Sequence, residues 1–172
     1  MSDAVVIMGV SGCGKSTLGR ALAAALDWRF VEGDALHPPA NIVKMAAGIP
    51  LQDEDRWPFL EHVAQAIIAG RPSGMVVSCS ALKRSYRDFL RERVGKVTFL
   101  LPVTDRERLV ARLAQRPHHF MPVSLLDSQL ATLESPAADE AAILVDGAAA
   151  TDAQVAYVLA ALRSRGSAPV VE

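Results

Sequence analysis

Short continuous apolar runs alternate along the chain with longer stretches in which apolar residues recur at helical spacing. Each run is expected to be a strand buried on both faces, because parallel strands covered by helices carry apolar residues on both sides. The predicted strands are Ala4–Met8, Arg29–Glu32, Met75–Cys79, Val97–Leu101 and Ala142–Val145. The predicted helices are Leu18–Leu26, Asn41–Ala47, Asp53–Ala69, Leu82–Val94, Asp105–Arg116, Ser124–Leu133 and Asp152–Arg163.

This alternation predicts an α/β fold with three layers, α/β/α, around a five-stranded parallel sheet. Strands that are separated by helices form parallel sheets, and the connecting helices cover both faces. The helix predicted over 53–69 is amphipathic, and its expected buried face consists of Trp57, Leu60, Ala64, Ile67 and Ile68. A length of 172 residues fits one domain. We assign this domain to residues 1–165 and expect 166–172 to be a flexible C-terminal tail.

Composition and charge narrow the function classes. Lys and Arg total 18, and Asp and Glu total 19, so the formal net charge is -1. A nearly neutral chain offers no global attraction for nucleic acid or an anionic membrane, and no apolar run reaches the roughly 18 residues of a membrane helix. The N-terminus lacks the basic segment of a signal peptide, and Cys13 and Cys79 form no disulfide or zinc pattern. We expect a cytoplasmic protein.

The segment between the first strand and the first helix matches the phosphate-binding pattern G-x-x-x-x-G-K-[ST]. Glycines allow backbone N–H groups to turn toward phosphate oxygens, and the helix N-terminus adds a positive dipole end. Lys15 is predicted to bridge the β- and γ-phosphates, and the Ser16 hydroxyl to ligate Mg²⁺. The alternative is a chance glycine-rich turn. The predicted ATP-binding residues here are Gly9, Val10, Ser11, Gly12, Cys13, Gly14, Lys15, Ser16 and Thr17.

Two carboxylates follow the second predicted strand, at Glu32 and Asp34. Strand ends in this architecture point toward the ligand crevice, and residues two apart on an extended segment share a face. One carboxylate could therefore organise the water shell of the metal while the other faces the hydroxyl of a substrate. Spacing alone permits either order, and an acidic turn without chemistry is the alternative.

Basic residues recur every four positions on two predicted helices. Lys83 and Arg87 follow the third strand and could hold an anionic substrate, although a solvated helix face would show the same spacing. Arg108, Arg112 and Arg116 precede a proline-bounded interruption. A helix that carries arginines into such a segment is typical of a lid that closes over ATP, here at about 117–123. Arg112 and Arg116 are predicted to contact ATP, and an exposed basic stripe is the alternative.

Several stretches recur in order along nearly the whole chain and carry a family resemblance. The most specific are Gly33-Asp34-Ala35-Leu36-His37-Pro38 and Cys79-Ser80-Ala81-Leu82-Lys83, supported by residues 8–16, 41–45, 53–58, 116–120 and 128–134. In these stretches the chain resembles gluconate kinases of the small P-loop type. The resemblance implies a nucleoside-monophosphate-kinase-like fold with a lid. It also implies a homodimer that converts ATP and D-gluconate to ADP and 6-phospho-D-gluconate.

The resemblance also implies roles for individual residues. Asp34 matches the acid beside the sugar hydroxyl, which assigns Glu32 to the magnesium shell through water. With Lys15 of the phosphate-binding loop and Arg116 before the lid, Asp34 completes the set of predicted catalytic residues. The implied substrate-binding residues are Asp34, His37, Lys44, Arg56, Ser80, Lys83, Arg87 and His119.

Two other functions remain open from the sequence. One is a kinase of the same fold for shikimate or a nucleoside monophosphate, although shikimate kinases usually carry a glycine triplet where this chain has residues 80–82. The other is a nucleotide-gated binding module, which would need the phosphate-binding loop but no second crevice with its own acid and basic pair.

Overall fold

The structure is a computed structural model that describes residues 3–115 and 122–166. Most of the predicted lid at 117–123, nearly all of the predicted tail at 166–172, and the predicted site residues Arg116 and His119 lie outside these ranges. None of the helices in the described ranges is long and apolar enough to cross a membrane.

A single parallel sheet of five strands forms the middle layer, in the order β2-β3-β1-β4-β5. The register places Val6 of β1 beside Val77 of β3 and Phe99 of β4. The strands are β1 (Ala4–Ile7), β2 (Arg29–Val31), β3 (Met75–Ser78), β4 (Thr98–Val103) and β5 (Ile143–Asp146). The three central strands are buried on both faces over most of their length, as their apolar runs predicted.

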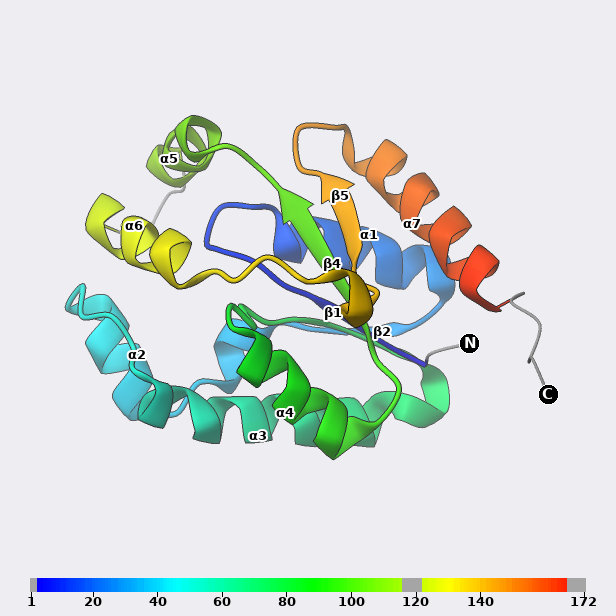
Figure 1. Ribbon diagram of the computed structural model, residues 1–172, viewed down its shortest axis with the longest axis horizontal. Coiled ribbons are helices and arrows are strands. Elements are labelled where there is room, and N and C mark those ends of the chain that lie inside the picture. The colour runs from blue at the N-terminus through cyan, green and yellow to red at the C-terminus, as the bar shows by residue number, and fades with distance from the viewer. Residues whose placement is uncertain (1–2, 116–121, 167–172) are drawn as a thin grey trace.

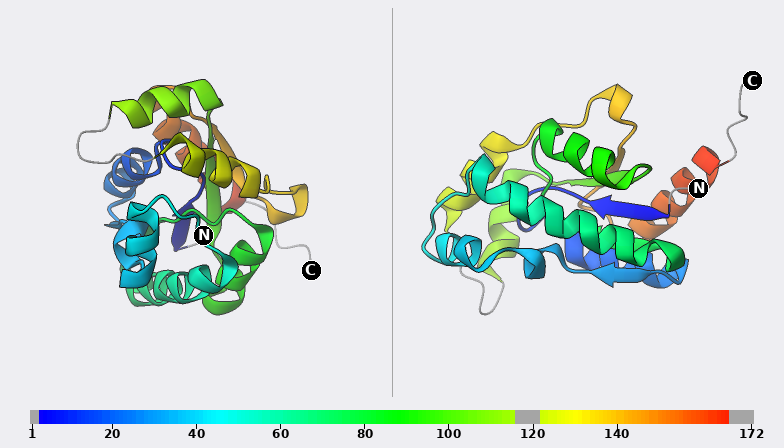
Figure 2. Two further views of the ribbon diagram at one scale, coloured as in Figure 1. Left: turned by 90° about the vertical axis from the view of Figure 1, so that its left-hand side faces the viewer. Right: turned by 90° about the horizontal axis from the view of Figure 1, so that it is seen from below.

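Helices cover both faces of the sheet, with α1 and α7 on one side and α3 and α4 on the other (Figure 1). The helices α2, α5 and α6 gather at the end of the molecule opposite the two termini (Figures 1 and 2). The α-helices are α1 (Lys15–Leu26), α2 (Pro39–Ala46), α3 (Asp53–Gly70), α4 (Arg84–Val94), α5 (Arg106–Ala114), α6 (Val123–Thr132) and α7 (Thr151–Gly166). The predicted three-layer α/β/α fold is confirmed.

The described residues form three apolar clusters, and one of them, which includes Val10, Leu109 and Leu126, joins the phosphate-binding loop to α5 and α6. The sheet separates the other two. One joins β1, β3 and β4 to α3 and α4, and the other joins the opposite faces of the strands to α1 and α7. Within α3 the prediction of the buried face was partly wrong, since Trp57 is 36% exposed and Ile68 is 52% exposed. Helical spacing identifies residues that share a side of the helix, but the position of the sheet decides how wide the covered stripe is. The buried residues of α3 are Phe59, Leu60, Val63, Ala64, Ile67 and Gly70.

The carboxyl ends of the parallel strands all lie at one edge of the sheet, where β1 runs into the loop before α1 (Figure 1). Open parallel sheets bind ligands outside this edge, because loops from several strands meet there. A ligand site is therefore expected at the loops after β1, β2, β3 and β5.

Candidate active site

The phosphate-binding loop has the backbone that its glycines predict. Gly14 caps α1 at φ 97°, in the left-handed region that side chains with a Cβ rarely adopt. Helix α1 begins at Lys15, three residues earlier than predicted, so Ser16 lies in its first turn. The Lys15 ammonium donates to the carbonyl of Val10 at 2.9 Å and thus folds over the loop. The loop amides and the helix N-terminus form a site for a phosphate group.

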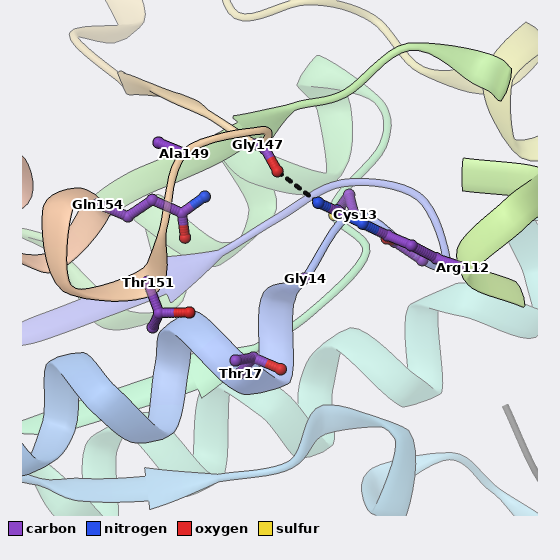
Figure 3. A pocket seen from close by; sticks show the side chains of 9 residues that line it. Cys13, Gly14, Thr17, Arg112, Gly147, Ala149, Thr151 and Gln154 are labelled. Carbon is purple, nitrogen blue, oxygen red and sulfur yellow. Dashed lines mark hydrogen bonds between the residues drawn. The ribbon is translucent and has the colours of Figure 1, made fainter. Parts of the chain in front are cut away.

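A cavity of about 300 Å³ lies beside this loop, between the start of α1 and the start of α7 (Figure 3). Arg112 of α5 closes one side, because its guanidinium donates to the carbonyls of Gly12 at 3.3 Å and Gly147 at 2.6 Å. Arg112, which the sequence analysis predicted to contact ATP, therefore lies beside the phosphate-binding loop. The cavity is lined by Gly12, Cys13, Gly14, Thr17, Arg112, Gly147, Ala149, Thr151 and Gln154.

Four of these lining residues, in the range 147–154, were missed by sequence reasoning. Gly147 and Ala149 belong to the connection between β5 and α7, and Thr151 and Gln154 lie in the first turn of α7. The signal available in the sequence was weak: a glycine two residues after a predicted strand of a parallel sheet, where loops converge on the site. Helix α6 supplies another missed residue, since the Gln129 side-chain carbonyl accepts a hydrogen bond at 2.8 Å from the amide of Ser11 in the phosphate-binding loop.

The carboxyl ends of β2 and β3 are tied together at Glu32. Its carboxylate accepts a hydrogen bond from the Ser78 hydroxyl and another from Arg20 at 3.5 Å. The Ser78 hydroxyl in turn accepts from the amide of Gly33 at 2.9 Å. A Cβ atom at Gly33 would overlap the carbonyl of Ser78, so the close approach of this segment to the end of β3 requires glycine.

The expectation that Glu32 and Asp34 share one face of an extended segment was wrong. The chain turns after Glu32 into a short 3₁₀ helix, η1 (Gly33–Leu36), which carries Asp34 away from the strand direction. Glu32 is consequently anchored at the sheet, whereas Asp34 is exposed to solvent. The two carboxylates therefore occupy different positions.

His37 lies directly after η1 and is half-buried, stacked on the Phe59 ring with the centroids 3.7 Å apart. Burial lowers the pKa of His37 to about 4; the neighbouring Asp34 opposes this change and Arg56 adds to it. His37 is therefore a neutral imidazole at physiological pH. The predicted residues Asp34, His37 and Arg56 are thus brought together between η1 and α3.

A group of cations and carboxylates lines the start of α3. Lys83 pairs with Asp53 at 2.8 Å, and Lys44 pairs with Asp55 at 2.6 Å. These partners raise the pKa of Lys83 and lower the pKa of both aspartates, mainly through the direct hydrogen bonds. The predicted residues Lys44 and Lys83 both lie in this group. The sequence analysis did not predict the two aspartates beside them.

Tyr86 of α4 connects this group to Arg56. Its hydroxyl donates to Asp53 and accepts from Arg56 at 3.2 Å. The guanidinium of Arg56 and the ammonium of Lys83 each lie 5.6 Å from the centre of the Tyr86 ring. Arg56 therefore donates to a neutral hydroxyl, whereas Lys83 already has a carboxylate partner.

The prediction that Arg87 would hold an anionic substrate is corrected by the structure. The side chain of Arg87 is fully buried, and its guanidinium forms a two-pronged ion pair with Glu140 at 2.6 and 2.8 Å. The remaining nitrogen donates to the carbonyls of Ala81 and Leu82 at 3.1 and 3.2 Å. Arg87 consequently holds the loop before Lys83 in place and is closed off from ligands.

Helix α4 begins at Arg84, two residues later than predicted, with Lys83 as its N-cap. Ala81 adopts φ 39°, in the left-handed region, which turns the chain out of β3 before the helix. Ser80 lies in this loop, and its carbonyl accepts from the amide of Gly9 at 3.0 Å. The predicted residue Ser80 is thereby placed next to the phosphate-binding loop.

Two residues of this site offer donor atoms for a magnesium ion. Ser16 and Glu32 supply oxygen atoms, which Mg²⁺ prefers, and the Glu32 side chain is 29% exposed, so water can reach it. Nucleotide-bound Mg²⁺ is typically held by one or two protein oxygens, waters and phosphates. The described residues include no group of three or more His, Cys, Asp or Glu that could hold a metal ion. Ser16 and Glu32 therefore fit a magnesium that arrives with a nucleotide.

Comparison with known sequences and structures shows which proteins this chain is similar to. The family model described as shikimate kinase matches residues 11–163. Gluconokinase from Gluconobacter oxydans is 51% identical over 147 residues, which cover 83% of this chain and 82% of that protein. A gluconokinase structure from Sinorhizobium meliloti matches with a TM-score of 0.85 at 48% identity, covering 94% of this chain and 92% of the other. A shikimate kinase from Bacteroides thetaiotaomicron matches with a TM-score of 0.68 at 16% identity, which shows the fold alone.

The fold and the phosphate-binding loop define a P-loop kinase with the architecture that shikimate kinases share. High identity over most of the chain is found with gluconokinases, whereas the shikimate kinase structure shares only the fold. The chain belongs to the gluconokinase family. The resemblance seen in the sequence motifs is thereby confirmed.

Proposed function

We propose that this protein is an ATP:D-gluconate 6-phosphotransferase, which converts D-gluconate to 6-phospho-D-gluconate. The observation that carries the proposal is a site with two parts at one edge of the sheet. One part is the phosphate-binding loop with its adjoining cavity, and the other is the group of acids and cations around Asp34, Arg56 and Lys83. A module that only binds nucleotide would not need the second part. Gluconokinase relatives support gluconate as the substrate.

On the nucleotide side, the nucleoside of ATP would occupy the cavity beside Arg112, and the phosphates would lie on the loop amides. Lys15 would leave the carbonyl of Val10 to contact the β- and γ-phosphates, where transition-state charge develops. A magnesium ion held by Ser16, and through water by Glu32, would neutralise charge on the phosphates. Positioning and electrostatic stabilisation account for most of the catalysis in phosphoryl transfer.

On the sugar side, Asp34 would orient the attacking hydroxyl and accept its proton. No hydrogen bond from the described part of the chain holds the Asp34 carboxylate, whereas Glu32 is anchored by Ser78. An uncommitted carboxylate can turn toward a substrate, and an anchored one is suited to a fixed metal shell. This difference supports Asp34 as the base and Glu32 as the magnesium residue.

The carboxylate of gluconate needs a cation that is not already neutralised. Lys44 and Lys83 each form an ion pair with an aspartate, whereas Arg56 donates to the neutral hydroxyl of Tyr86 and feels Asp53 and Asp55 only through longer-range charge. Its planar fork can bind a carboxylate through two parallel hydrogen bonds. We therefore assign the sugar carboxylate to Arg56, with the lysines supporting the surrounding hydroxyls.

The proposed assembly and location rest on the family alone. We propose that residues 1–165 work as one kinase domain in a cytoplasmic homodimer, in keeping with the resemblance to gluconate kinases. Size-exclusion chromatography with light scattering would show one species at twice the chain mass of 18.4 kDa. A monomer at all concentrations would contradict the dimer.

The substrate is tested by measuring ADP release with D-gluconate, D-glucose and shikimate, over a range of each. D-Gluconate is expected to give the highest kcat/KM, since loss of a charge-assisted contact costs about 2–5 kcal/mol. The variant Arg56→Gln should lose most of its preference for D-gluconate over D-glucose, while Arg93→Gln, on the outer face of α4, serves as the control. Equal use of shikimate by the unaltered protein would overturn the proposal.

A further inference from the structure

Asn41 in the first turn of α2 is almost completely buried, at 3% exposure, beside the candidate sugar site. Its side-chain nitrogen donates to the backbone carbonyl of Asp55 at 2.7 Å. A carbonyl oxygen can only accept, so this contact determines which end of the Asn41 amide is the nitrogen. The same nitrogen has a second proton, and it lies 3.2 Å from Nδ1 of His37.

The contact with Asn41 decides the protonation of His37. Because the Asn41 nitrogen is a donor, Nδ1 of His37 must be the acceptor and carry no proton. A neutral imidazole then has its single proton on Nε2. Stacking on Phe59 holds the ring in place, and its burial keeps the imidazole neutral. The charged groups that act on the ring are Asp34 and Arg56, and the Lys44–Asp55 pair lies beyond Asn41.

We propose that His37 is a neutral hydrogen-bond donor, through Nε2–H, to a hydroxyl of the polyol substrate, and that Asn41 is the positioning residue that imposes this tautomer. This inference rests on the proposed function and deepens it. It assigns recognition of a neutral hydroxyl to His37, separate from recognition of the carboxylate by Arg56.

A neutral His37 also suits the proposed role of Asp34. A cationic imidazole next to Asp34 would stabilise the carboxylate and make it a weaker base. A neutral ring donates a hydrogen bond to the substrate without weakening Asp34 as a base. Asn41 therefore acts on the reaction through His37 and has no need to touch the substrate.

The tautomer can be measured in the protein without substrate. Long-range ¹H–¹⁵N spectra of the uniformly labelled protein distinguish a protonated ring nitrogen from a bare one. His62 provides an internal contrast, because its Nδ1 faces the carbonyl of Leu36 at 2.9 Å and must donate there. At pH 7 we expect His37 to show Nε2–H and His62 to show Nδ1–H. The variants His37→Gln and His62→Gln assign the two signals.

Kinetics test the consequence for the substrate. The unaltered protein should show no inflection in kcat/KM for D-gluconate near pH 6.5 that belongs to His37. In Asn41→Asp, a carboxylate faces Nδ1, which raises the pKa of His37 and holds the proton of the neutral ring on Nδ1. The imidazolium form would still donate from Nε2, but the neutral form would not. We therefore expect kcat/KM for D-gluconate in Asn41→Asp to lie about 10–100-fold below that of the unaltered protein at pH values above the new pKa.

Two controls separate this role from a general loss of structure. His37→Gln retains an N–H donor and should keep kcat/KM within about tenfold of the unaltered protein at all pH values, whereas His37→Ala should lose about 10–100-fold. His62→Gln should change neither the value of kcat/KM nor its dependence on pH. An Nδ1–H tautomer at His37 would overturn the inference regardless of activity. So would a pH profile of Asn41→Asp that matches the unaltered protein. Failure of the unaltered protein to phosphorylate D-gluconate would instead contradict the proposed function, with the tautomer still measured independently.

Discussion

The ion pair between Arg87 and Glu140 allows the sharpest test of how this fold is held together. The Glu140 carboxylate is buried and accepts from Arg87 at 2.6 and 2.8 Å, from Arg91 at 3.2 Å, and from the amide of Ala137 at 3.0 Å. The substitution Glu140→Gln keeps the shape of the side chain but removes its charge. The Arg87 guanidinium would then be buried without a counter-charge, which is the costly case for a buried pair.

The pKa of Glu140 gives the size of the effect. Its hydrogen bonds to Arg87 are the main reason that this pKa falls from 4.5 to about 2. At about 1.4 kcal/mol for each tenfold change in proton affinity, the native state gains roughly 3 kcal/mol from the charged carboxylate. Removal of one partner of a buried pair typically costs about 3–5 kcal/mol. We therefore expect Glu140→Gln to lower the free energy of unfolding at pH 7 by about 3 kcal/mol.

The neighbouring residue provides a matched control. Asp139 pairs with Arg84 at 2.6 Å, but both side chains are largely exposed, so water and salt screen the interaction. Asp139→Asn should leave the unfolding free energy almost unchanged. Urea unfolding followed by tryptophan fluorescence measures both variants. An equal loss in the two variants, or no loss in Glu140→Gln, would refute the argument from burial.

The pH dependence of the difference has a definite sign. The native pKa of Glu140 is lowered, so its stabilisation is complete above the ordinary value of 4.5 and is lost as pH falls toward about 2. The gap in stability between the unaltered protein and Glu140→Gln should therefore shrink as pH falls across this window. A gap that stays constant from pH 6 to pH 3 would show that the charge of Glu140 is not its source.

Three further predictions concern the candidate site and the strand ends that hold it. Lys15→Ala should abolish ADP release while circular dichroism stays unchanged, and an active variant would contradict phosphate contact by Lys15. Gly33→Ala should lower the melting temperature strongly, because its Cβ would overlap the carbonyl of Ser78, and a normal melting temperature would show that the strands can separate there. Asp34→Asn should cut kcat about 10²–10⁴-fold, whereas Glu32→Gln should raise the magnesium concentration for half-maximal rate; kinetics over a magnesium series would show the reverse if the two roles are exchanged.

The order of strands and helices was predictable because it depends on local pattern. The apolar runs at Ala4–Ile7 and Met75–Ser78 are strands, and the glycine-rich loop lies between a strand and a helix as its spacing required. In such segments, backbone conformation and burial on both faces follow from a few neighbouring residues. The motif that includes Asp34 and His37 likewise predicted a candidate site without any tertiary information.

Only the tertiary structure decided what each charged residue contacts. Lys83 and Arg87 are equivalent in spacing, yet Lys83 stays near the surface beside Asp53, whereas Arg87 is buried against Glu140, which is 53 residues away. Gln129 reaches the phosphate-binding loop over 118 residues of sequence. Residues that come together through sheet order and helix packing are distant along the chain, so local periodicity carries no record of their contact. For that reason a candidate site could be predicted from motifs, while the contacts of its charged residues emerged only in the folded chain.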